Sequence, residues 1–313
     1  MVPGVLLPRT TTRAAGRSTG RPPARSRPGI PAAGDPVGDL QVLDAVGPPA
    51  TLDVPVSRGR TMHATVLGPV NGRPAVALHG LGGSTEQNLP ALTAVSVRYA
   101  LRTYAIDLPN HGRSGTVGPF HFHVRHFSAL IAETVRALDI EPTVLIGHSF
   151  GGQLAALLAF DLATEPLHPI FINPAIGAPW DSKLRRCWRQ PWRFLRLVQE
   201  LGYDDSNVDR NELYHAGRLL QSILDMLLDR ELKPYRRLQA TLALLLNDRT
   251  AGILDDLGRR GIRPVIVQGM LDRSTPALDD VHLVDGFHSW LHKADGPRAL
   301  LAALDKVFPG QLP

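Results

Sequence analysis

The chain has 313 residues, of which 43% are hydrophobic and 20% charged, as in an ordinary globular protein with one large domain. No apolar run is long enough to span a bilayer, so we expect no transmembrane segment. Cys187 is the single cysteine, which excludes an internal disulfide framework and favours a reducing, cytoplasmic location.

The net charge of +5 is gathered at the amino terminus. Residues 1–34 hold six arginines and no acidic residue, so residues 35–313 carry a net charge of about −1. This body gives no electrostatic reason to expect a nucleic-acid partner. The tail is rich in Pro, Gly, Arg and Ser, which predicts a disordered segment. Its composition also resembles an organelle transit peptide, although its prolines oppose the amphipathic helix of such peptides.

From about residue 40, short strands alternate with helices. Leu40–Val46 and Arg60–Leu67 are predicted to pair as an antiparallel hairpin at one sheet edge. The predicted elements that follow are strands at Pro74–Leu78, Leu101–Asp107, Thr143–Ile146 and Ile170–Asn173, and helices at Glu86–Tyr99, Val124–Leu138 and Gln153–Leu162.

Residues 177–246 interrupt this alternation with a wholly helical pattern. Strands at Pro264–Gln268 and Val281–Val284 and a helix at Gly296–Phe308 complete the chain. The pattern predicts an α/β fold with a mostly parallel sheet between helices. We divide its body into a core, residues 35–176 and 247–313, and a helical cap, residues 177–246, over the carboxyl ends of the strands.

Gly147-His148-Ser149-Phe150-Gly151 separates the strand TVLI from an apolar helix. This is Gly-x-Ser-x-Gly in the strand–turn–helix setting of a nucleophile elbow. The glycines allow a sharp turn that lifts the Ser149 hydroxyl clear of the sheet. The amino terminus of the helix stabilises negative charge that develops there. We therefore predict Ser149 as a nucleophile, with a glycine-rich turn of no chemical role as the alternative.

His79-Gly80-Leu81-Gly82-Gly83 follows the strand PAVAL. Such a loop can turn the backbone N–H of Leu81 toward a substrate oxygen, where it would form an oxyanion hole with the N–H of Phe150. Gly80 and Gly82 let the backbone come close, and we place both of them, with His148, beside the substrate. The alternative is a simple strand-to-loop turn.

A catalytic serine needs a base, and the base needs an orienting acid. His288 stands directly after the strand VHLV, where a loop could reach Ser149. Asp272 follows the strand PVIVQ, which makes it the predicted acid. Parallel neighbours normally need a longer crossover than the one between these two strands. Three alternatives to Asp272 therefore stay open: Asp279, Asp280 and Asp285.

The motifs HGLGGS, DLPNHGRS, GHSFGG, GMLDRSTP and GFHSW, in this order, resemble those of the α/β-hydrolase superfamily, and within it the AB hydrolase-1 group. The resemblance covers roughly residues 40–310. It implies a mostly parallel α/β-hydrolase sheet flanked by helices, with a helical cap insertion and a Ser-His-Asp triad. It also implies that DLPNHGRS is a structural loop, so we interpret His111 as structural.

The predicted cap opens with a basic segment, residues 180–201. One interpretation is a Trp-bearing amphipathic segment that contacts a membrane surface or an anionic substrate. The other, which we favour, is a lid that packs its apolar side chains on the core and leaves its arginines in water. In either case we place Trp188 beside the substrate.

Together these features predict a serine hydrolase that cleaves an ester, thioester, lactone or amide of a small to medium apolar molecule, with no cofactor and no metal. Alternatives on the same fold are carbon–carbon bond hydrolysis, acyl transfer, perhydrolysis, and ligand binding with little turnover. A serine at position 149 argues against the carboxylate nucleophile that haloalkane dehalogenases and epoxide hydrolases use.

Overall fold

The computed structural model describes residues 48–162, 166–190, 192–193, 234–247, 249–309 and 312. The predicted disordered tail, residues 1–34, lies outside these residues. So does the predicted strand Leu40–Val46.

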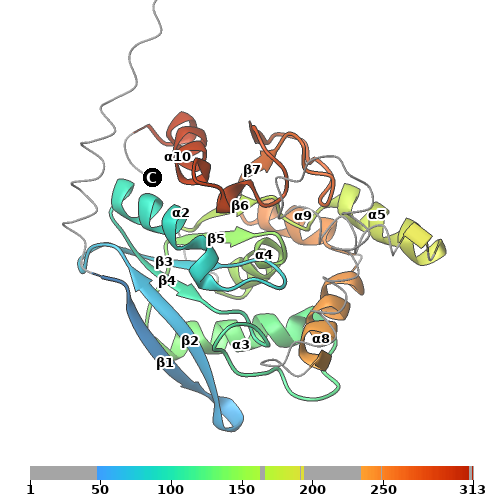
Figure 1. Cartoon of the computed structure of the whole chain (residues 1–313), viewed down its shortest axis with the longest axis horizontal. Coiled ribbons are helices and arrows are strands. Elements are labelled where there is room, and N and C mark those ends of the chain that lie inside the picture. Colours follow the sequence, from blue (N-terminus) through green and yellow to red (C-terminus); the bar gives the residue numbers. More distant parts are fainter. Residues whose placement is uncertain are drawn as a thin grey trace, which may run out of the picture.

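The described residues form an eight-stranded sheet in the order β1-β2-β4-β3-β5-β6-β7-β8 (Figure 1). The strands are β1 (Ala50–Val56), β2 (Arg60–Leu67), β3 (Arg73–Leu78), β4 (Leu101–Ile106), β5 (Val144–His148), β6 (His168–Ile172), β7 (Val265–Gly269) and β8 (His282–Val284). β1 pairs with β2, and β2 with β4, in the antiparallel sense, and every other neighbouring pair is parallel. The predicted mostly parallel α/β fold is confirmed.

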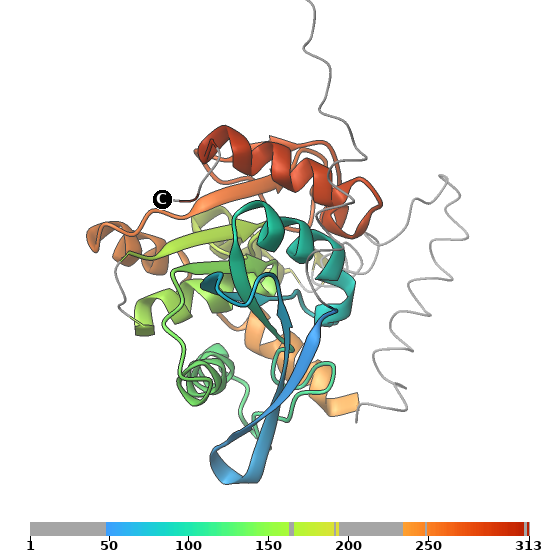
Figure 2. The ribbon, with the colours of Figure 1, turned by 90° about the vertical axis from the view of Figure 1, so that its left-hand side faces the viewer.

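The hairpin at the sheet edge differs from the prediction. β2 pairs with Ala50–Val56, and the two are joined by the short helix η1 (Ser57–Gly59). Left-handed φ values of 60° at Arg58 and 66° at Gly59 reverse the chain within this connection. A tight reversal pairs a strand with its immediate predecessor, so the nearer segment takes the place predicted for Leu40–Val46. Figure 2 shows the blue hairpin extending away from the body.

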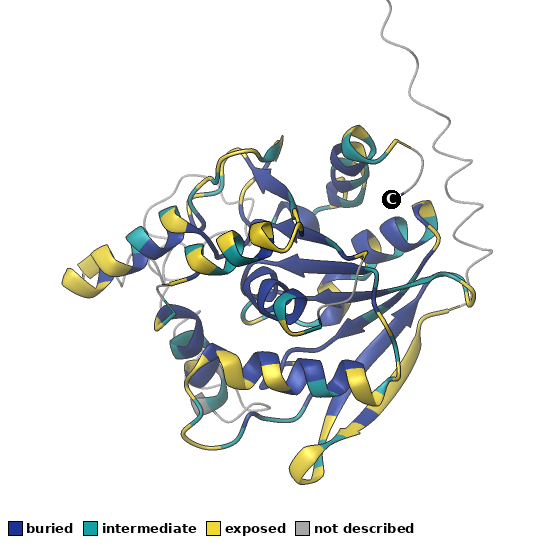
Figure 3. Cartoon of the chain, turned by 180° about the vertical axis from the view of Figure 1, so that it is seen from behind, coloured by how far each residue is buried: buried dark blue, intermediate teal, exposed yellow. Residues whose placement is uncertain are grey.

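Helices cover both faces of the sheet (Figure 1). α2 (Thr85–Arg98) and α10 (Gly296–Val307) pack on one face, whereas α3 (Val124–Ala137), α4 (Phe150–Leu162) and α9 (Ala251–Arg259) pack on the other. α4 is buried along most of its length, as its uniformly apolar sequence predicts (Figure 3). No helix in the described part of the chain is long and apolar enough to cross a membrane.

The connection from β7 to β8, residues 270–281, contains no helix. The side chain of Gln268 on β7 holds this connection in place. Its Nε2 donates to the carbonyl of Thr275 at 2.9 Å, and its Oε1 accepts from the N–H of Leu278 at 3.4 Å. Because Leu278 also packs on the core, the connection reaches β8 without the helix that parallel neighbours usually require.

Two helices of the predicted cap are described, α5 (Ala178–Arg189) and α8 (Pro234–Leu245). Lys183 on α5 donates to the carbonyls of Arg273 and Ser274, which follow β7, at 2.7 and 2.9 Å. Asn110, which follows β4, donates to the carbonyl of Arg236 on α8 at 3.1 Å. Both helices therefore contact loops at the carboxyl ends of the parallel strands. Residues 191 and 194–233 lie outside the described residues, so the domain boundaries stay predictions.

Candidate active site

Ser149 is the single residue between β5 and α4. Its φ of 53° is left-handed, a strained conformation that non-glycine residues adopt mainly where the surrounding structure enforces it. A Cβ at Gly147 would lie 2.6 Å from the Gly151 carbonyl oxygen, and one at Gly151 would lie 2.3 Å from that of Leu78. Both flanking positions of the motif therefore require glycine, and the packing that they permit forms the sharp turn.

Three predicted site residues meet at the carboxyl ends of their strands. Ser149 follows β5, Asp272 follows β7, and His288 follows β8. Nε2 of His288 lies 2.8 Å from Ser149 Oγ, and its Nδ1 lies 2.9 Å from Asp272 Oδ2. The histidine thus contacts the hydroxyl and the carboxylate from opposite sides of its ring. The three side chains form a candidate Ser-His-Asp triad.

The carboxylate of Asp272 is held from several directions. Its Oδ1 accepts from the N–H groups of Ser274 at 2.8 Å and Thr275 at 3.1 Å, and its Oδ2 accepts from the Thr275 hydroxyl. Burial raises the pKa of Asp272 to about 6, against the hydrogen bonds from Thr275 and Ser274, which lower it. The alternative acids, Asp279, Asp280 and Asp285, are exposed.

Burial lowers the pKa of His288 to about 3, and the neighbouring His292 and Lys183 lower it further. At neutral pH the imidazole is therefore neutral beside an ionised Asp272. A carboxylate can only accept, so Nδ1 carries the hydrogen and the Nε2 lone pair faces the Ser149 hydroxyl. These are the protonation states that a general base requires.

The predicted oxyanion loop lies against the elbow. A Cβ at Gly80 would stand 3.0 Å from His148 Nδ1 and 3.3 Å from Ser149 Cβ, so a larger residue would fit only if these neighbours shifted. The N–H of Gly83 donates to the Gly80 carbonyl at 3.2 Å and closes a turn, in which Gly82 is exposed and has a φ of 74°. This backbone requirement explains Gly82 without a substrate contact. Phe150 is the first residue of α4, so its N–H has no acceptor within the helix.

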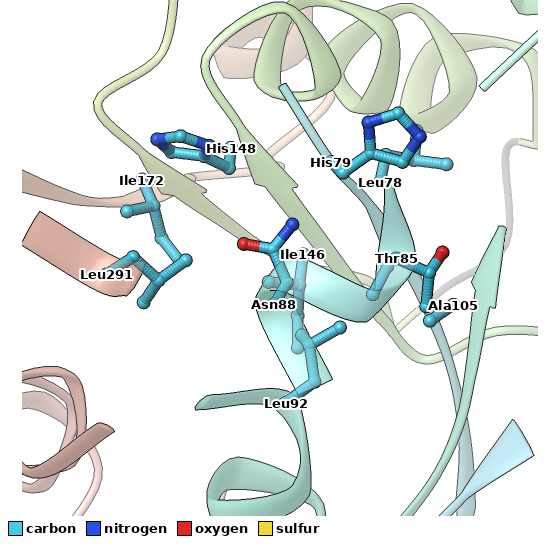
Figure 4. A pocket seen from close by; sticks show the side chains of 11 residues that line it. Leu78, His79, Thr85, Asn88, Leu92, Ala105, Ile146, His148, Ile172 and Leu291 are labelled. Carbon is cyan, nitrogen blue, oxygen red and sulfur yellow. The ribbon is translucent and has the colours of Figure 1, made fainter. Parts of the chain in front are cut away.

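The side chain of His148 lies on the α2 side of the sheet, and its predicted contact with the substrate stays a prediction. Successive side chains of a strand point to opposite faces, so the residue before the elbow serine turns toward the α2 side of the sheet. There His148 lines a cavity of about 10 Å³, room for about one water, together with Asn88 (Figure 4). Its Nε2 lies 3.2 Å from the carbonyl oxygen of His288. His148 thus contacts the main chain of His288, the candidate base, from the α2 side of the sheet.

Trp188 is half exposed, and its Nε1 donates to the carbonyl of Leu245 at 3.1 Å. The bond joins α5 to the end of α8. A substrate contact of Trp188 stays a prediction. His111, interpreted as structural, is buried, with Nδ1 3.0 Å from the carbonyl oxygen of Pro109.

Sequence reasoning missed two residues that lie beside the candidate triad. Asn173, directly after β6, donates from Nδ2 to the carbonyl of His288. Lys183 on α5 is held by the loop that carries Asp272. The signal available for Asn173 was an amide directly after a buried strand that ends at the site edge. Within the described ranges, no group of three or more His, Cys, Asp or Glu side chains is arranged to hold a metal ion.

Residues 75–309 match the sequence profile of the Alpha/beta hydrolase family. The chain belongs to this family. This α/β hydrolase is 28% identical over 235 residues to a protein of Mycobacterium phage D29 named "Putative non-heme haloperoxidase", a match that covers 70% of this chain and 82% of the phage protein.

One shorter sequence match and one structural match accompany this comparison. The α/β hydrolase is 32% identical over 117 residues to the sn-1-specific diacylglycerol lipase ABHD11 of Xenopus laevis, which is 36% of each chain. It thus spans about a third of that lipase. Among solved structures, the bromoperoxidase from Bacillus anthracis superposes with a TM-score of 0.55 at 17% identity, over 82% of this chain and 100% of the bromoperoxidase. The last match shows a common fold alone.

Proposed function

We propose that this α/β hydrolase is a serine hydrolase that cleaves an ester, thioester, lactone or amide of a small to medium apolar substrate. The observation that carries the proposal is the position of the His288 ring, 2.8 Å from Ser149 Oγ and 2.9 Å from Asp272 Oδ2. A neutral imidazole that faces a serine hydroxyl and is oriented by a buried carboxylate can activate that hydroxyl at neutral pH.

In the first half-reaction, Ser149 Oγ attacks the substrate carbonyl carbon while its proton moves to Nε2 of His288. The N–H groups of Leu81 and Phe150 stabilise the oxyanion that forms. The intermediate collapses as the bond to the leaving group breaks, and His288 gives its proton to that group. The product of this step is an acyl-enzyme on Ser149. Asp272 stays ionised and stabilises the imidazolium throughout.

In the second half-reaction, water attacks the acyl carbon and gives a proton to His288. The bond to Oγ then breaks, the acid leaves, and the proton returns to Ser149. The match to a diacylglycerol lipase supports acyl transfer to water and a substrate with apolar chains.

The test combines a fluorophosphonate probe with a series of p-nitrophenyl esters of increasing chain length. Wild-type protein should be labelled and should hydrolyse at least one ester, and Ser149→Ala should abolish both. Ser128→Ala is the matched control, because Ser128 is also buried but its hydroxyl donates to Asp161 on the α3–α4 side of the sheet. A pure wild-type protein without labelling or hydrolysis would instead favour a ligand-binding role.

Variants of the acid test its assignment. Asp272→Asn should lower kcat by a factor on the order of 10⁴ with the fold intact, because the imidazole loses its orienting partner. Asp285→Asn is the control, since Asp285 is exposed. Loss of activity in Asp285→Asn together with retention in Asp272→Asn would show that the acid is wrongly assigned.

Perhydrolysis is a second candidate, favoured by the similarity to the phage protein named as a haloperoxidase. Hydrogen peroxide would then replace water in the second half-reaction, and the product would be a peracid with the proton returned to Ser149 by the same route. Supplying an ester, peroxide and bromide with a bromination indicator tests this, with Ser149→Ala as the control. Ester hydrolysis without indicator bromination would exclude it.

A further inference from the structure

Asn173 lies between the strands that lead to Ser149 and Asp272. It follows β6, which stands between β5 and β7 in the sheet. Asn173 is 0% exposed, and its φ of 43° is left-handed, a conformation that asparagine tolerates better than most residues. Its N–H donates to the Val267 carbonyl of β7 at 2.9 Å. The backbone thus extends the β6–β7 pairing while the side chain is free to reach the loops beyond the sheet.

Both ends of the Asn173 amide are used. Its Oδ1 accepts from the N–H of Gly269, at the start of the loop that carries Asp272, at 2.8 Å. Its Nδ2 donates to the main-chain carbonyl of His288. Because an N–H can only donate and a carbonyl can only accept, these partners fix which end of the amide faces which loop. The main-chain carbonyl oxygen of Asn173 lies 3.4 Å from the hydroxyl of Thr275, and the same hydroxyl donates to Oδ2 of Asp272.

The carbonyl of His288 has a second donor, Nε2 of His148, at 3.2 Å. His148 precedes Ser149 in the chain, so it ties the main chain of His288 to the elbow. Asn173 ties the same carbonyl to the loop of Asp272. Two buried side chains thus fix the backbone of the histidine from the nucleophile side and from the acid side.

We infer that Asn173 is a positioning residue for the proposed hydrolysis, whose amide sets the spacing between the Asp272 loop and the main chain of His288. The inference rests on the proposed function. The role needs a neutral side chain with an acceptor at one end and a donor at the other. An alanine has neither, and a carboxyl group has the donor only while it is protonated.

Asn173→Asp is the informative variant, since it keeps the shape of the side chain. When the introduced carboxyl ionises, the His288 carbonyl loses one of its two donors, keeps His148 Nε2, and faces a negative charge. The charged and titratable groups around His288 are those of Asp272, His148, His292 and Lys183, and the substitution leaves them in place. The expected result is a kcat lower than that of wild type by about 10- to 100-fold at pH 8, with KM little changed.

The pH profile is the reading that a merely structural role would not produce. We would follow the rate of fluorophosphonate labelling and of p-nitrophenyl acetate hydrolysis from pH 5 to pH 9. Both rates of the wild-type protein should rise with pH and then stay constant. Both rates of Asn173→Asp should pass through a maximum and fall at high pH, because only the protonated carboxyl group can donate to the main-chain carbonyl of His288.

Asn110→Asp is the matched control. Asn110 is likewise 0% exposed and left-handed, with a φ of 70°. Its Oδ1 accepts from the N–H of Val117 at 3.0 Å, and its Nδ2 donates to the carbonyl of Arg236 and to Gln239 Oε1, so it has a similar bonding pattern away from the triad. Asn110→Asp should lose a similar amount of thermal stability but keep the shape of the wild-type profile. If the activity of both variants is reduced by the same factor at every pH, Asn173 has only a structural role and the inference is overturned.

The failure of the proposed function would give a different result, in which wild type neither reacts with the probe nor hydrolyses the ester. The imidazole resonances of His288, followed by NMR on histidine-labelled protein, test Asn173 in that case as well. They should shift in Asn173→Asp and stay in place in Asn110→Asp. Unchanged resonances in both variants would overturn the inference.

Discussion

The imidazole of His79 donates from Nδ1 to the carbonyl oxygen of Gly80, 2.8 Å away. The tautomer is set by Leu108, whose N–H donates to Nε2 of the same ring at 2.9 Å. In a trans peptide the C=O and N–H groups point in opposite directions. Holding the Gly80 carbonyl toward His79 therefore turns the N–H of Leu81 away from it, as a donor to a substrate oxygen requires.

His79→Ala should consequently lower the kcat of ester hydrolysis by a factor on the order of 10², with KM nearly unchanged, because one oxyanion donor loses its orientation. Steady-state kinetics on the best p-nitrophenyl ester measures both constants. His63→Ala is the control, since His63 is also buried but pairs with Asp53 in the β1–β2 hairpin at 2.7 Å. A stable His79→Ala protein with full kcat would show that Leu81 has no such role.

The pH profile of wild type should be set by Asp272. Burial raises its pKa to about 6, and the carboxylate must be ionised to orient His288, so kcat/KM should fall about tenfold per pH unit below 6 and level off above it. Burial lowers the pKa of His288 to about 3, which keeps it neutral across this range.

Substitution of Lys183 should change the pH at which kcat/KM begins to fall, which is the acid limb of the profile. Its positive charge lowers the pKa of both Asp272 and His288. Lys183→Met should therefore shift the limb of kcat/KM to higher pH, whereas Lys183→Arg, which keeps the charge, should not. An unshifted limb in Lys183→Met would mean that other groups control the profile.

Buried neutral histidines should make the fold sensitive to acid. Burial lowers the pKa of His148 and of His288, so unfolding takes up protons below the ordinary value of 6.5. For His288 the free energy of unfolding should fall by about 1.4 kcal/mol per pH unit from about pH 6.5 toward pH 3. Asp272 acts in the opposite sense between pH 6 and 3.8, because its pKa is raised in the folded state.

Urea unfolding at pH 7.5, 6.5 and 5.5 measures this dependence. His148→Gln removes one buried histidine and should show a smaller loss of stability between pH 7.5 and 5.5 than wild type. Equal pH slopes for the two proteins would contradict the assignment of a neutral His148 in the fold.

Binding to lipid vesicles distinguishes the two interpretations of residues 180–201, a segment that contacts a membrane surface and a lid with its arginines in water. Trp188 on α5 is 49% exposed and Trp192, beyond the end of α5, is 65% exposed. Arg185, Arg186 and Arg189 on α5 are also exposed. If the segment binds anionic lipid, the protein should sediment with phosphatidylserine-containing vesicles and not with pure phosphatidylcholine.

Trp192→Ala should reduce that sedimentation, and added salt should reverse it. Phe120→Ala is the control, because Phe120 is 87% exposed in the loop before α3. Equal sedimentation with both kinds of vesicle, or with neither, would leave α5 as an ordinary exposed lid edge.

The sequence by itself determined the parallel sheet, the elbow, and the edge at which Ser149, Asp272 and His288 lie. Each of these depends on local order: apolar runs predict buried strands, and a residue that follows a parallel strand must lie at its carboxyl end. The order of the motifs was enough to propose which side chains should meet there.

Only the tertiary structure decided the hairpin partner of β2, the course of residues 270–281, and the hydrogen-bond partners of His148 and Asn173. These depend on contacts between segments distant in the chain. Gln268 can replace a crossover helix only because Thr275 and Leu278 fold back onto β7. Asn173 becomes informative only when Gly269 and the His288 carbonyl lie on either side of it. A hydrogen bond requires both partners in place, and the position of the second partner is a property of the folded chain.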